Sequence, residues 1–165
     1  MQIIKLGIIS LIVFALLITG LSLFFPSHIR VSKAVDINAS KDSVMKLIAD
    51  AANWKKWYPG ADTTTFYMVA DKIKGISTGD RKALKITEVN DSAVLAVNAG
   101  PNSKKGESGW NFFDGRTPNT VTVQWYMDFH LRWYPWEKFS SLLLEKRYGP
   151  MMEQGLEKLK SLAEK

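Results

Sequence analysis

The segment from Leu6 to Phe25, LGIISLIVFALLITGLSLFF, constrains this chain most, because it holds twenty consecutive residues without a charge. As a helix it would be roughly 30 Å long, about the thickness of the hydrocarbon core of a bilayer. A cleaved secretory signal is the alternative, but its apolar core usually has only about 7 to 15 residues and ends in small residues. This run ends in Phe24-Phe25-Pro26 instead. We therefore predict an uncleaved anchor over residues 1–25, with residues 6–25 in the lipid bilayer.

The charges that flank this anchor do not fix its orientation. Lys5 precedes the apolar run, and Arg30, Lys33 and Lys41 follow it, so the positive charges on the two sides are nearly balanced. The chain has no cysteine, which excludes disulfides and thiolate metal sites but is compatible with either a cytosolic or a periplasmic domain. We expect a single-pass membrane protein and leave the side of its soluble part open.

The residues after the anchor suit one domain. A short linker, residues 26–30, would hold a single domain, residues 31–165, within roughly 20 Å of the lipid surface. Beyond residue 25 there are 21 Lys and Arg against 16 Asp and Glu. The basic residues form short scattered pairs such as Lys55-Lys56, and no nucleic-acid recognition motif accompanies them. We therefore expect a solvated surface that favours an anionic membrane face, and no nucleic-acid partner.

The pattern of apolar residues predicts strands and helices in a definite order. Residues 31–37 alternate as a first strand. Ser40 is a predicted N-cap for a helix with Val44 and Ile48 on its apolar face, and residues 52–60 continue as a second short helix. Short runs of period two then predict an antiparallel meander, with strands near residues 66–70, 84–87, 93–97 and 109–113 and with turns at residues 75–80 and 99–109.

The clearest strand is NTVTVQWYMDFHLRW, residues 119–133, in which every second residue is apolar. One face of this strand should be buried and the other wet. A long helical region follows Tyr134-Pro135 and runs to the end of the chain, with an interruption predicted at Gly149-Pro150 because helices tolerate these two residues least. The sequence thus predicts an α+β domain that ends in a long helix.

The sequence predicts no catalytic site, no metal site and no cofactor. His28 and His130 stand alone, so that neither a catalytic triad nor a pair of histidine metal ligands can be assembled around them. The acidic residues fall singly near predicted turns. Gly75 and Gly79 lack the Gly-Lys-Ser/Thr ending of a phosphate-binding loop.

Aromatic residues are the unusual feature of the predicted domain, since all six tryptophans of the chain follow the anchor. Trp110, Phe112, Trp125, Met127 and Met152 are bulky or soft side chains on elements predicted to face one another. One sheet covered by one helix leaves room for a cavity between them, and an apolar cavity is typical of a small-molecule site. Periodicity does not distinguish such a cavity from a filled core, so both interpretations stay open.

Four segments together resemble the START-type helix-grip superfamily, also called SRPBCC, in its polyketide cyclase/dehydrase and lipid-transport branch. They occur in the order typical of the family and span essentially all of residues 30–163: VSKAVDINASKDSVMKLIADAANWKKWYPG, KALKITEVNDSAVLAV, NTVTVQWYMDF and YGPMMEQGLEKLK. An anchor before such a domain resembles a known bacterial variant of the family, which implies the bacterial cytoplasmic membrane. The segment KIKGISTGDRKAL departs from the family pattern, which has a tryptophan on a strand at this point.

The resemblance implies a curved antiparallel sheet, of seven strands or slightly fewer, around a long C-terminal helix, with a hydrophobic cavity between them. It implies binding of a lipid, isoprenoid or polyketide-like molecule without fixing one activity. It gives no protein partner. The candidate cavity-lining residues are Trp57, Tyr58, Phe66, Met68, Ile86, Trp110, Phe112, Trp125, Met127, Met152, Gly155 and Leu156.

Two functions follow as hypotheses. The first is a membrane-tethered module that binds an apolar ligand. The second is a cyclase or dehydrase, which would need an acid or a base inside the cavity. Glu88 is predicted to point to the same face of its strand as Leu84 and Ile86, and Tyr58 or Tyr67 could donate a hydrogen bond. A carboxylate at the end of a strand, however, more often lies at the solvent-exposed rim. The sequence therefore favours binding over catalysis.

The segment YGPMMEQGLEKLK holds two glycines and a proline within a helical pattern. We expect Pro150 to open a new helical piece, where its missing N–H costs nothing. Gly155 lies beside Leu156 on the predicted apolar face, so either the helix approaches the sheet closely there or a side chain would intrude on the cavity.

Overall fold

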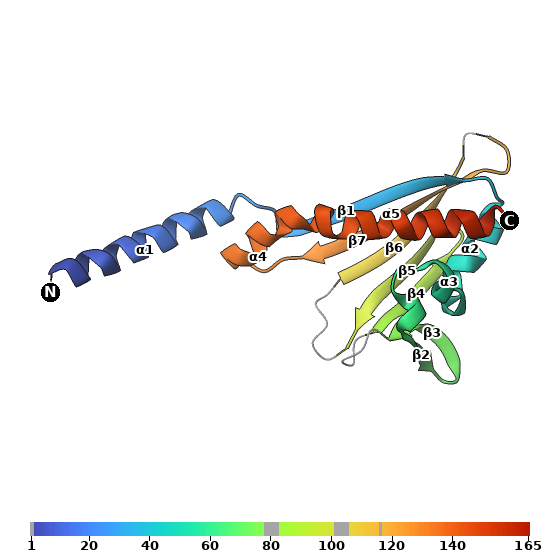
Figure 1. Ribbon diagram of the computed structural model, residues 1–165, viewed down its shortest axis with the longest axis horizontal. Helices are drawn as coiled ribbons and strands as arrows, with labels where there is room; N and C mark the ends of the chain where they lie inside the picture. The colour runs from blue at the N-terminus through green and yellow to red at the C-terminus, as the bar shows by residue number, and fades with distance from the viewer. Residues whose placement is uncertain (1, 78–82, 101–105, 116) are drawn as a thin grey trace.

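The computed structural model describes residues 2–77, 83–100, 106–115 and 117–165. It begins with the apolar helix α1 (Gln2–Ser22), whose apolar stretch is wholly exposed. A helix of this length, composition and position is found both in membrane spans and in signal sequences. Figure 1 shows α1 projecting away from the rest of the molecule. Met1, the first residue of the predicted anchor, lies outside the described residues.

Seven strands form one antiparallel sheet in the order β1-β7-β6-β5-β4-β3-β2. Their bounds are β1 (His28–Ile37), β2 (Thr65–Val69), β3 (Lys72–Ser77), β4 (Ala83–Asn90), β5 (Ala93–Ala99), β6 (Gly106–Asp114) and β7 (Val121–His130). Strands β2 to β7 follow one another as a meander, and β1 pairs with the last strand, β7, over its whole length. This confirms the predicted meander and places the first strand at the opposite edge from β2.

Two groups of helices accompany the sheet. Between β1 and β2 lie α2 (Lys41–Ala49), η1 (Ala51–Asn53), α3 (Trp54–Trp57) and η2 (Ala61–Thr63). After β7 come α4 (Pro135–Ser140), η3 (Ser141–Leu143) and the long helix α5 (Leu144–Ala163). In Figure 1, α5 runs along β1 and β7, and α2 and α3 lie near its C-terminal end. The predicted α+β helix-grip architecture, a curved sheet around a long C-terminal helix, is confirmed.

Local sequence explains where the first helix begins. Ser40 has an extended backbone, and its hydroxyl oxygen accepts a hydrogen bond from the amide of Ser43, so that one unpaired donor of the first turn is satisfied. Asp42 lies in that first turn, where the helix dipole favours a negative charge. Val44 and Ile48, one turn apart, are buried. The predicted cap and the predicted apolar face are both confirmed.

The segment that departs from the family pattern still forms a strand, because β3 pairs with β2 on one side and with β4 on the other. The predicted turn over residues 75–80 is therefore wrong at its beginning, where Gly75, Ile76 and Ser77 belong to β3; its remaining residues, 78–80, lie outside the described residues. The predicted turn over residues 99–109 is likewise occupied at both ends by β5 and β6, and its residues 101–105 are not described.

The helix interruption predicted at Gly149-Pro150 is wrong, because α5 continues through both residues. The break lies earlier, in the single 3-10 turn η3 between α4 and α5. A proline inside a helix costs about 3 kcal/mol. Burial of the apolar face of α5 against the sheet, with Met152, Leu156 and Leu159 at 2% exposure or less, offsets this cost.

Gly149 has a packing role within α5. The ammonium group of Lys33 on β1 reaches Glu145 at 2.8 Å and Glu153 at 2.9 Å, which lie one turn before and one turn after this glycine. A Cβ atom at position 149 would lie 3.2 Å from Cε of Lys33. The missing side chain thus lets Lys33 cross the helix between its two carboxylate partners.

Gly155 marks the closest approach of α5 to the rest of the domain. A Cβ atom at position 155 would lie 2.7 Å from Cζ3 of Trp125 and 2.9 Å from Cδ of Pro59. Trp125 is fully buried and Pro59 is a partly buried ring fixed to the backbone, so neither can move aside as the end of an exposed side chain can. Gly155 is therefore required by the close approach of helix and sheet.

We predict that Gly155→Ala lowers the free energy of unfolding by about 1–3 kcal/mol relative to Gly149→Ala, because it overpacks the core. Both substitutions replace a glycine inside α5 by alanine, so the gain in helix propensity of about 1 kcal/mol is common to both and cancels. Urea unfolding of the full-length protein in detergent micelles measures the difference. Equal stability of the two variants would contradict the close approach.

Candidate functional site

An aromatic core cluster fills the space between the sheet and the helices. Its members are Trp54, Trp57, Tyr58, Trp110 and Trp125. The ring centroids of contacting pairs lie 5.2–6.5 Å apart, in stacked, tilted and edge-on arrangements. The four tryptophans are at most 1% exposed. Pairs of this kind contribute about 0.5–1.5 kcal/mol each beyond the area that they bury.

Three of the four indole N–H groups in the aromatic core cluster have a partner. Trp54 donates to the carbonyl of Ile48, Trp57 donates to the carbonyl of Leu47, and Trp125 donates to the hydroxyl of Ser108 at 2.8 Å. The N–H group of Trp110 has no hydrogen-bond partner among the described residues. Because an unpaired buried donor is costly, this group stands out within an otherwise satisfied core.

The structure brings most of the twelve predicted cavity-lining residues together around the aromatic core cluster. Eight of them are buried: Trp57, Trp110, Phe112, Trp125, Met127, Met152, Gly155 and Leu156. Tyr58, Phe66 and Ile86 are partly buried, and Met68 is 56% exposed. Met68 lies on the edge strand β2, and the irregularity beside it, between Tyr67 and Met68, places the extra residue, Lys74, on β3.

A partly enclosed pocket of about 570 Å³ opens at the other end of α5, where its first turns leave the sheet. The apolar lining comes from β7, the residue after it, η3 and α5: Phe129, Leu131, Leu143, Leu144 and Tyr148. Polar groups line the rest: Asn98, His130, Ser140, Lys146 and Arg147, with Gly106 at the start of β6. Among the described residues, the lining includes two cationic side chains and no acidic one, so the pocket combines apolar walls with a basic rim.

The pocket and the predicted residues form one continuous track. On β7 the inward positions run from Phe129 in the pocket to Met127 and then to Trp125 in the core. On α5 the corresponding face runs from Tyr148 in the pocket to Met152, one turn further on. The rings of Phe129 and Tyr148 lie 4.9 Å apart. Met127 and Met152 thus lie deeper along the same sheet–helix interface, and none of the twelve predicted residues lines this pocket.

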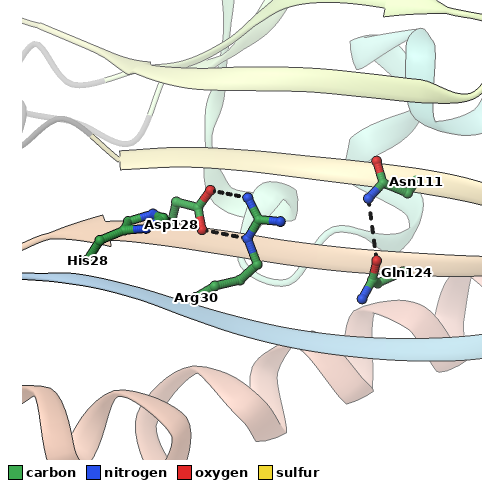
Figure 2. A network of polar contacts seen from close by, with 5 residues as sticks. All are labelled: His28, Arg30, Asn111, Gln124 and Asp128. Carbon is green, nitrogen blue, oxygen red and sulfur yellow. Dashed lines mark hydrogen bonds and ion pairs between the residues drawn. The ribbon is translucent and has the colours of Figure 1, made fainter. Parts of the chain in front are cut away.

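The outer face of the sheet carries a polar network, shown in Figure 2. Arg30 on β1 donates two hydrogen bonds to Asp128 on β7, from Nε at 2.8 Å and from Nη2 at 2.6 Å. The guanidinium group also lies 4.1 Å from the ring centre of Tyr126. The imidazole of His28 lies 3.4 Å from the Asp128 carboxylate and stacks on His130. Asn111 and Gln124 form a separate pair in the same view.

This network corrects the expectation that one face of β7 is wet. Tyr126 and Asp128 are 7% and 4% exposed although both belong to the outer face. Tyr126 pairs across the sheet with Gly109, and its ring occupies the space that a Cβ atom at position 109 would need. Arg30 covers Tyr126 and neutralises Asp128, so both side chains are shielded from water without a second layer of structure.

A sequence model described as "Polyketide cyclase / dehydrase and lipid transport" matches residues 28–164. The chain belongs to this family. No curated protein matches the chain. The pocket lies within the matched residues, between the last strand of the sheet and the helix that closes the domain.

Solved structures share the fold at low sequence identity. A START superfamily protein from Mycobacterium smegmatis has a TM-score of 0.59 at 15% identity, covering 82% of this chain and 97% of that one. A protein from Thermobifida fusca has a TM-score of 0.58 at 15% identity, covering 79% and 90%. The Aha1 dimer of Colwellia psychrerythraea has a TM-score of 0.53 at 17% identity, covering 82% and 96%. The resemblance to START-type proteins predicted from the sequence is confirmed.

Two of the candidate acid–base residues, Glu88 and Tyr58, do not line the pocket. The β4–β5 pairing is irregular between Ile86 and Glu88, so Glu88 loses the parity of Ile86 and becomes exposed, where it accepts a hydrogen bond from Asn90. Burial raises the pKa of Tyr58 far above its ordinary value of 10.0, with a smaller contribution from Tyr148, so Tyr58 stays neutral. Among the described residues, no group of three His, Asp or Glu side chains could hold a metal ion.

Sequence reasoning missed the pocket for identifiable reasons. Phe129 and Leu131 belong to the apolar alternation of the last strand, and Lys146-Arg147 is a visible basic pair. No periodicity shows, however, that the end of β7 and the first turn of α5 diverge and leave space between them.

We predict that Asp128→Asn lowers the free energy of unfolding by about 1–2 kcal/mol at neutral pH. Because Arg30 is half-exposed, water screens its charge, and this range is set lower than for a fully buried ion pair. The hydrogen bonds from Arg30 hold the pKa of Asp128 below its ordinary value of 3.8, against an opposing effect of burial. This contribution is therefore fully present above pH 3.8 and is lost as the pH falls through the lower pKa of the folded state. Unfolding by urea across this pH range should bring wild type and variant together in acid; a difference that stays constant would contradict the assignment.

We predict that Trp110→Phe is less destabilising than Trp125→Phe by about 1–3 kcal/mol, although both make the same change in a fully buried ring. The first substitution removes a buried N–H group that has no partner among the described residues. The second leaves the buried Ser108 hydroxyl without its donor. Urea unfolding of the two full-length variants tests this, and equal losses would contradict the hydrogen-bond assignment.

Proposed function

We propose that this protein is a membrane-tethered binder of an apolar small molecule, a lipid, isoprenoid or polyketide-like compound, held between β7 and α5. Residues 1–25 act as an uncleaved anchor, residues 26–30 as a short linker and residues 31–165 as the ligand-binding domain. The pocket of about 570 Å³ with apolar walls carries the proposal, since small-molecule sites have about this volume and composition. Family and fold support it, because they suggest a hydrophobic ligand-binding or cyclase-like domain.

The polar groups of the pocket suggest how a ligand would be oriented. Lys146 and Arg147 are exposed at the rim, whereas Phe129 and Tyr148 pack against each other on its apolar side. A ligand with an apolar body and an anionic or polar head would place its body against the aromatic rings and its head at the rim. Burial of apolar ligand area contributes roughly 25 cal/mol per Å², so no specific polar contact is required for useful affinity.

Those of the predicted lining residues that are buried between β7 and α5 enter the proposal as the deeper part of the binding track. Met127 and Met152 continue the two walls of the pocket, and methionine side chains adapt readily to new neighbours. A ligand longer than the pocket would displace these side chains and reach the aromatic core cluster. There the N–H group of Trp110, which lacks a partner among the described residues, is the available donor for an acceptor atom of the ligand.

The enzymatic alternative, a cyclase or dehydrase, has no specific support. Its carboxylate candidate, Glu88, is exposed and lies outside the pocket lining. Tyr58 keeps its proton and can donate a hydrogen bond, but it does not line the pocket either. We therefore propose binding without catalysis as the principal function.

Native mass spectrometry of full-length protein, purified from its own host and released from detergent micelles, tests the proposal. We expect a retained ligand on the wild type. Leu144→Trp fills the pocket and should reduce ligand occupancy at least about tenfold, which corresponds to about 1.4 kcal/mol of binding free energy. Leu142→Trp is the matched control, because Leu142 is an exposed neighbour that does not line the pocket.

Leu142→Trp should retain the ligand at the wild-type level. Absence of any bound molecule on the wild type, together with no binding of added lipid, would reject the proposed function. Equal occupancy in the two variants would place the ligand outside this pocket.

A further inference from the structure

A surface patch between β7 and α5 exposes large apolar side chains next to the pocket. We call it the interfacial patch and define it by Trp133, Trp136, Phe139, Leu142 and Leu143, which are 63%, 67%, 37%, 64% and 62% exposed. Tyr134 lies between the two tryptophans, with its ring 4.8 Å from each of theirs. Contiguous exposed apolar side chains of this kind usually mark a surface that something else covers.

The segment formed by α4 and η3 buries polar side chains and exposes apolar ones, which is the reverse of a helix on the surface of a protein in water. In α4 and η3 the buried side chains are the polar ones, Glu137, Lys138 and Ser141, each at most 8% exposed. Apart from Ser140, the exposed side chains of α4 and η3 belong to the interfacial patch. A helix packed on a domain in water normally buries its apolar side and exposes its polar side. The medium outside α4 is therefore one in which apolar side chains are favoured.

Contacts with the end of α1 fix the position of the interfacial patch. The ammonium group of Lys138 donates to the carbonyl of Phe25 at 2.9 Å and to the hydroxyl of Ser27 at 2.7 Å. The rings of Phe25 and Phe139 meet edge to face with centroids 5.3 Å apart. In Figure 1, α4 lies at the end of the domain from which α1 departs. The interfacial patch thus lies next to the apolar surface of α1, at the point where the chain leaves this helix.

We propose that the interfacial patch lies in the headgroup region of the bilayer that α1 crosses, and that it holds the mouth of the pocket at the lipid surface. This inference rests on the membrane tether of the proposed function. Trp and Tyr side chains prefer this region of a bilayer. Leu143 belongs both to the interfacial patch and to the pocket lining. A lipid would therefore pass from the bilayer into the pocket without crossing water.

The charges around the interfacial patch fit a bilayer with anionic lipids better than a second copy of this basic chain. Lys146 and Arg147 are exposed beside it, Arg132 is paired with Glu137, and the whole chain has a net charge of +6. Basic side chains near an anionic lipid surface add attraction, whereas two copies facing each other would bring like charges together. The observations therefore favour lipid, and not a second copy of the chain, as what covers the interfacial patch.

Quenching of tryptophan fluorescence by brominated lipids tests this inference, because bromine quenches by contact with the indole. The full-length protein is reconstituted into vesicles of brominated phosphatidylcholine and phosphatidylglycerol, and into matched unbrominated vesicles. The span α1 contains no tryptophan, and four of the six tryptophans are buried in the aromatic core cluster. Quenching therefore reports on Trp133 and Trp136. We expect a loss of fluorescence in the wild type that largely disappears in the double variant Trp133→Phe/Trp136→Phe.

Trp54→Phe is the matched control, since it removes a core tryptophan to which no ligand contact is assigned and leaves both patch tryptophans in place. Its fractional quenching should be at least as large as that of the wild type. Protein that floats with the vesicles but shows equal fluorescence in brominated and unbrominated lipid would overturn the inference while leaving the tether intact. Protein that does not float would instead reject the tether of the proposed function. Quenching that falls as the protein-to-lipid ratio rises would show a second copy covering the patch, and would also overturn the inference.

Discussion

The contact between Gly155 and Trp125 sets the geometry on which the rest of the domain depends. Without a side chain at position 155, α5 lies close enough to the sheet for the rings of Trp57, Trp110 and Trp125 to pack without a helical side chain between them. At the opposite end of α5, Tyr148 meets Phe129 with both rings in place, so helix and sheet stand further apart there. One helix is thus held close to the sheet at one end and separated from it at the other, and the pocket opens at the separated end.

The contacts of two lysine side chains, one with carboxylates and one with neutral oxygen atoms, complete this arrangement. Lys33 joins β1 to α5 through Glu145 and Glu153, and Lys138 joins the segment after β7 to the residues that follow α1. The first fixes the N-terminal half of α5 beside the pocket. The second fixes α4 against the end of the apolar helix, which places the interfacial patch and the pocket mouth on the side of the domain that faces α1. The contacts that hold α4 and α5 in place therefore lie beside the pocket and the interfacial patch, along the proposed route of a ligand.

Much of the fold could be predicted from local patterns, and the failures have specific physical causes. The cap at Ser40 and the buried apolar face of β7 depend on neighbouring residues only, and both predictions are confirmed. The opposite face of β7 was predicted to be wet but is buried at Tyr126 and Asp128. The prediction for Pro150 failed because burial of the apolar face of α5 outweighs the local cost of proline. The prediction that Glu88 lies on the same face of β4 as Ile86 failed because an irregularity in the strand pairing moves its side chain to the other face. This irregularity has no signature in the sequence. Burial of Asp128 was missed because its partner, Arg30, lies 98 residues away along the chain.

The sequence by itself determined that the chain has one long apolar helix near its start and one α+β domain after it, because these features follow from uncharged length and from periodicity. It also determined the family, since four segments in a fixed order carry the resemblance. Only the tertiary structure decided where open space remains. The aromatic side chains that were predicted to line a cavity pack against one another instead. The pocket lies beside the first turns of α5, where the distance between β7 and α5 depends on contacts made elsewhere along these two elements. The reversed polarity of α4 likewise has meaning only once Lys138 is seen to face the end of α1.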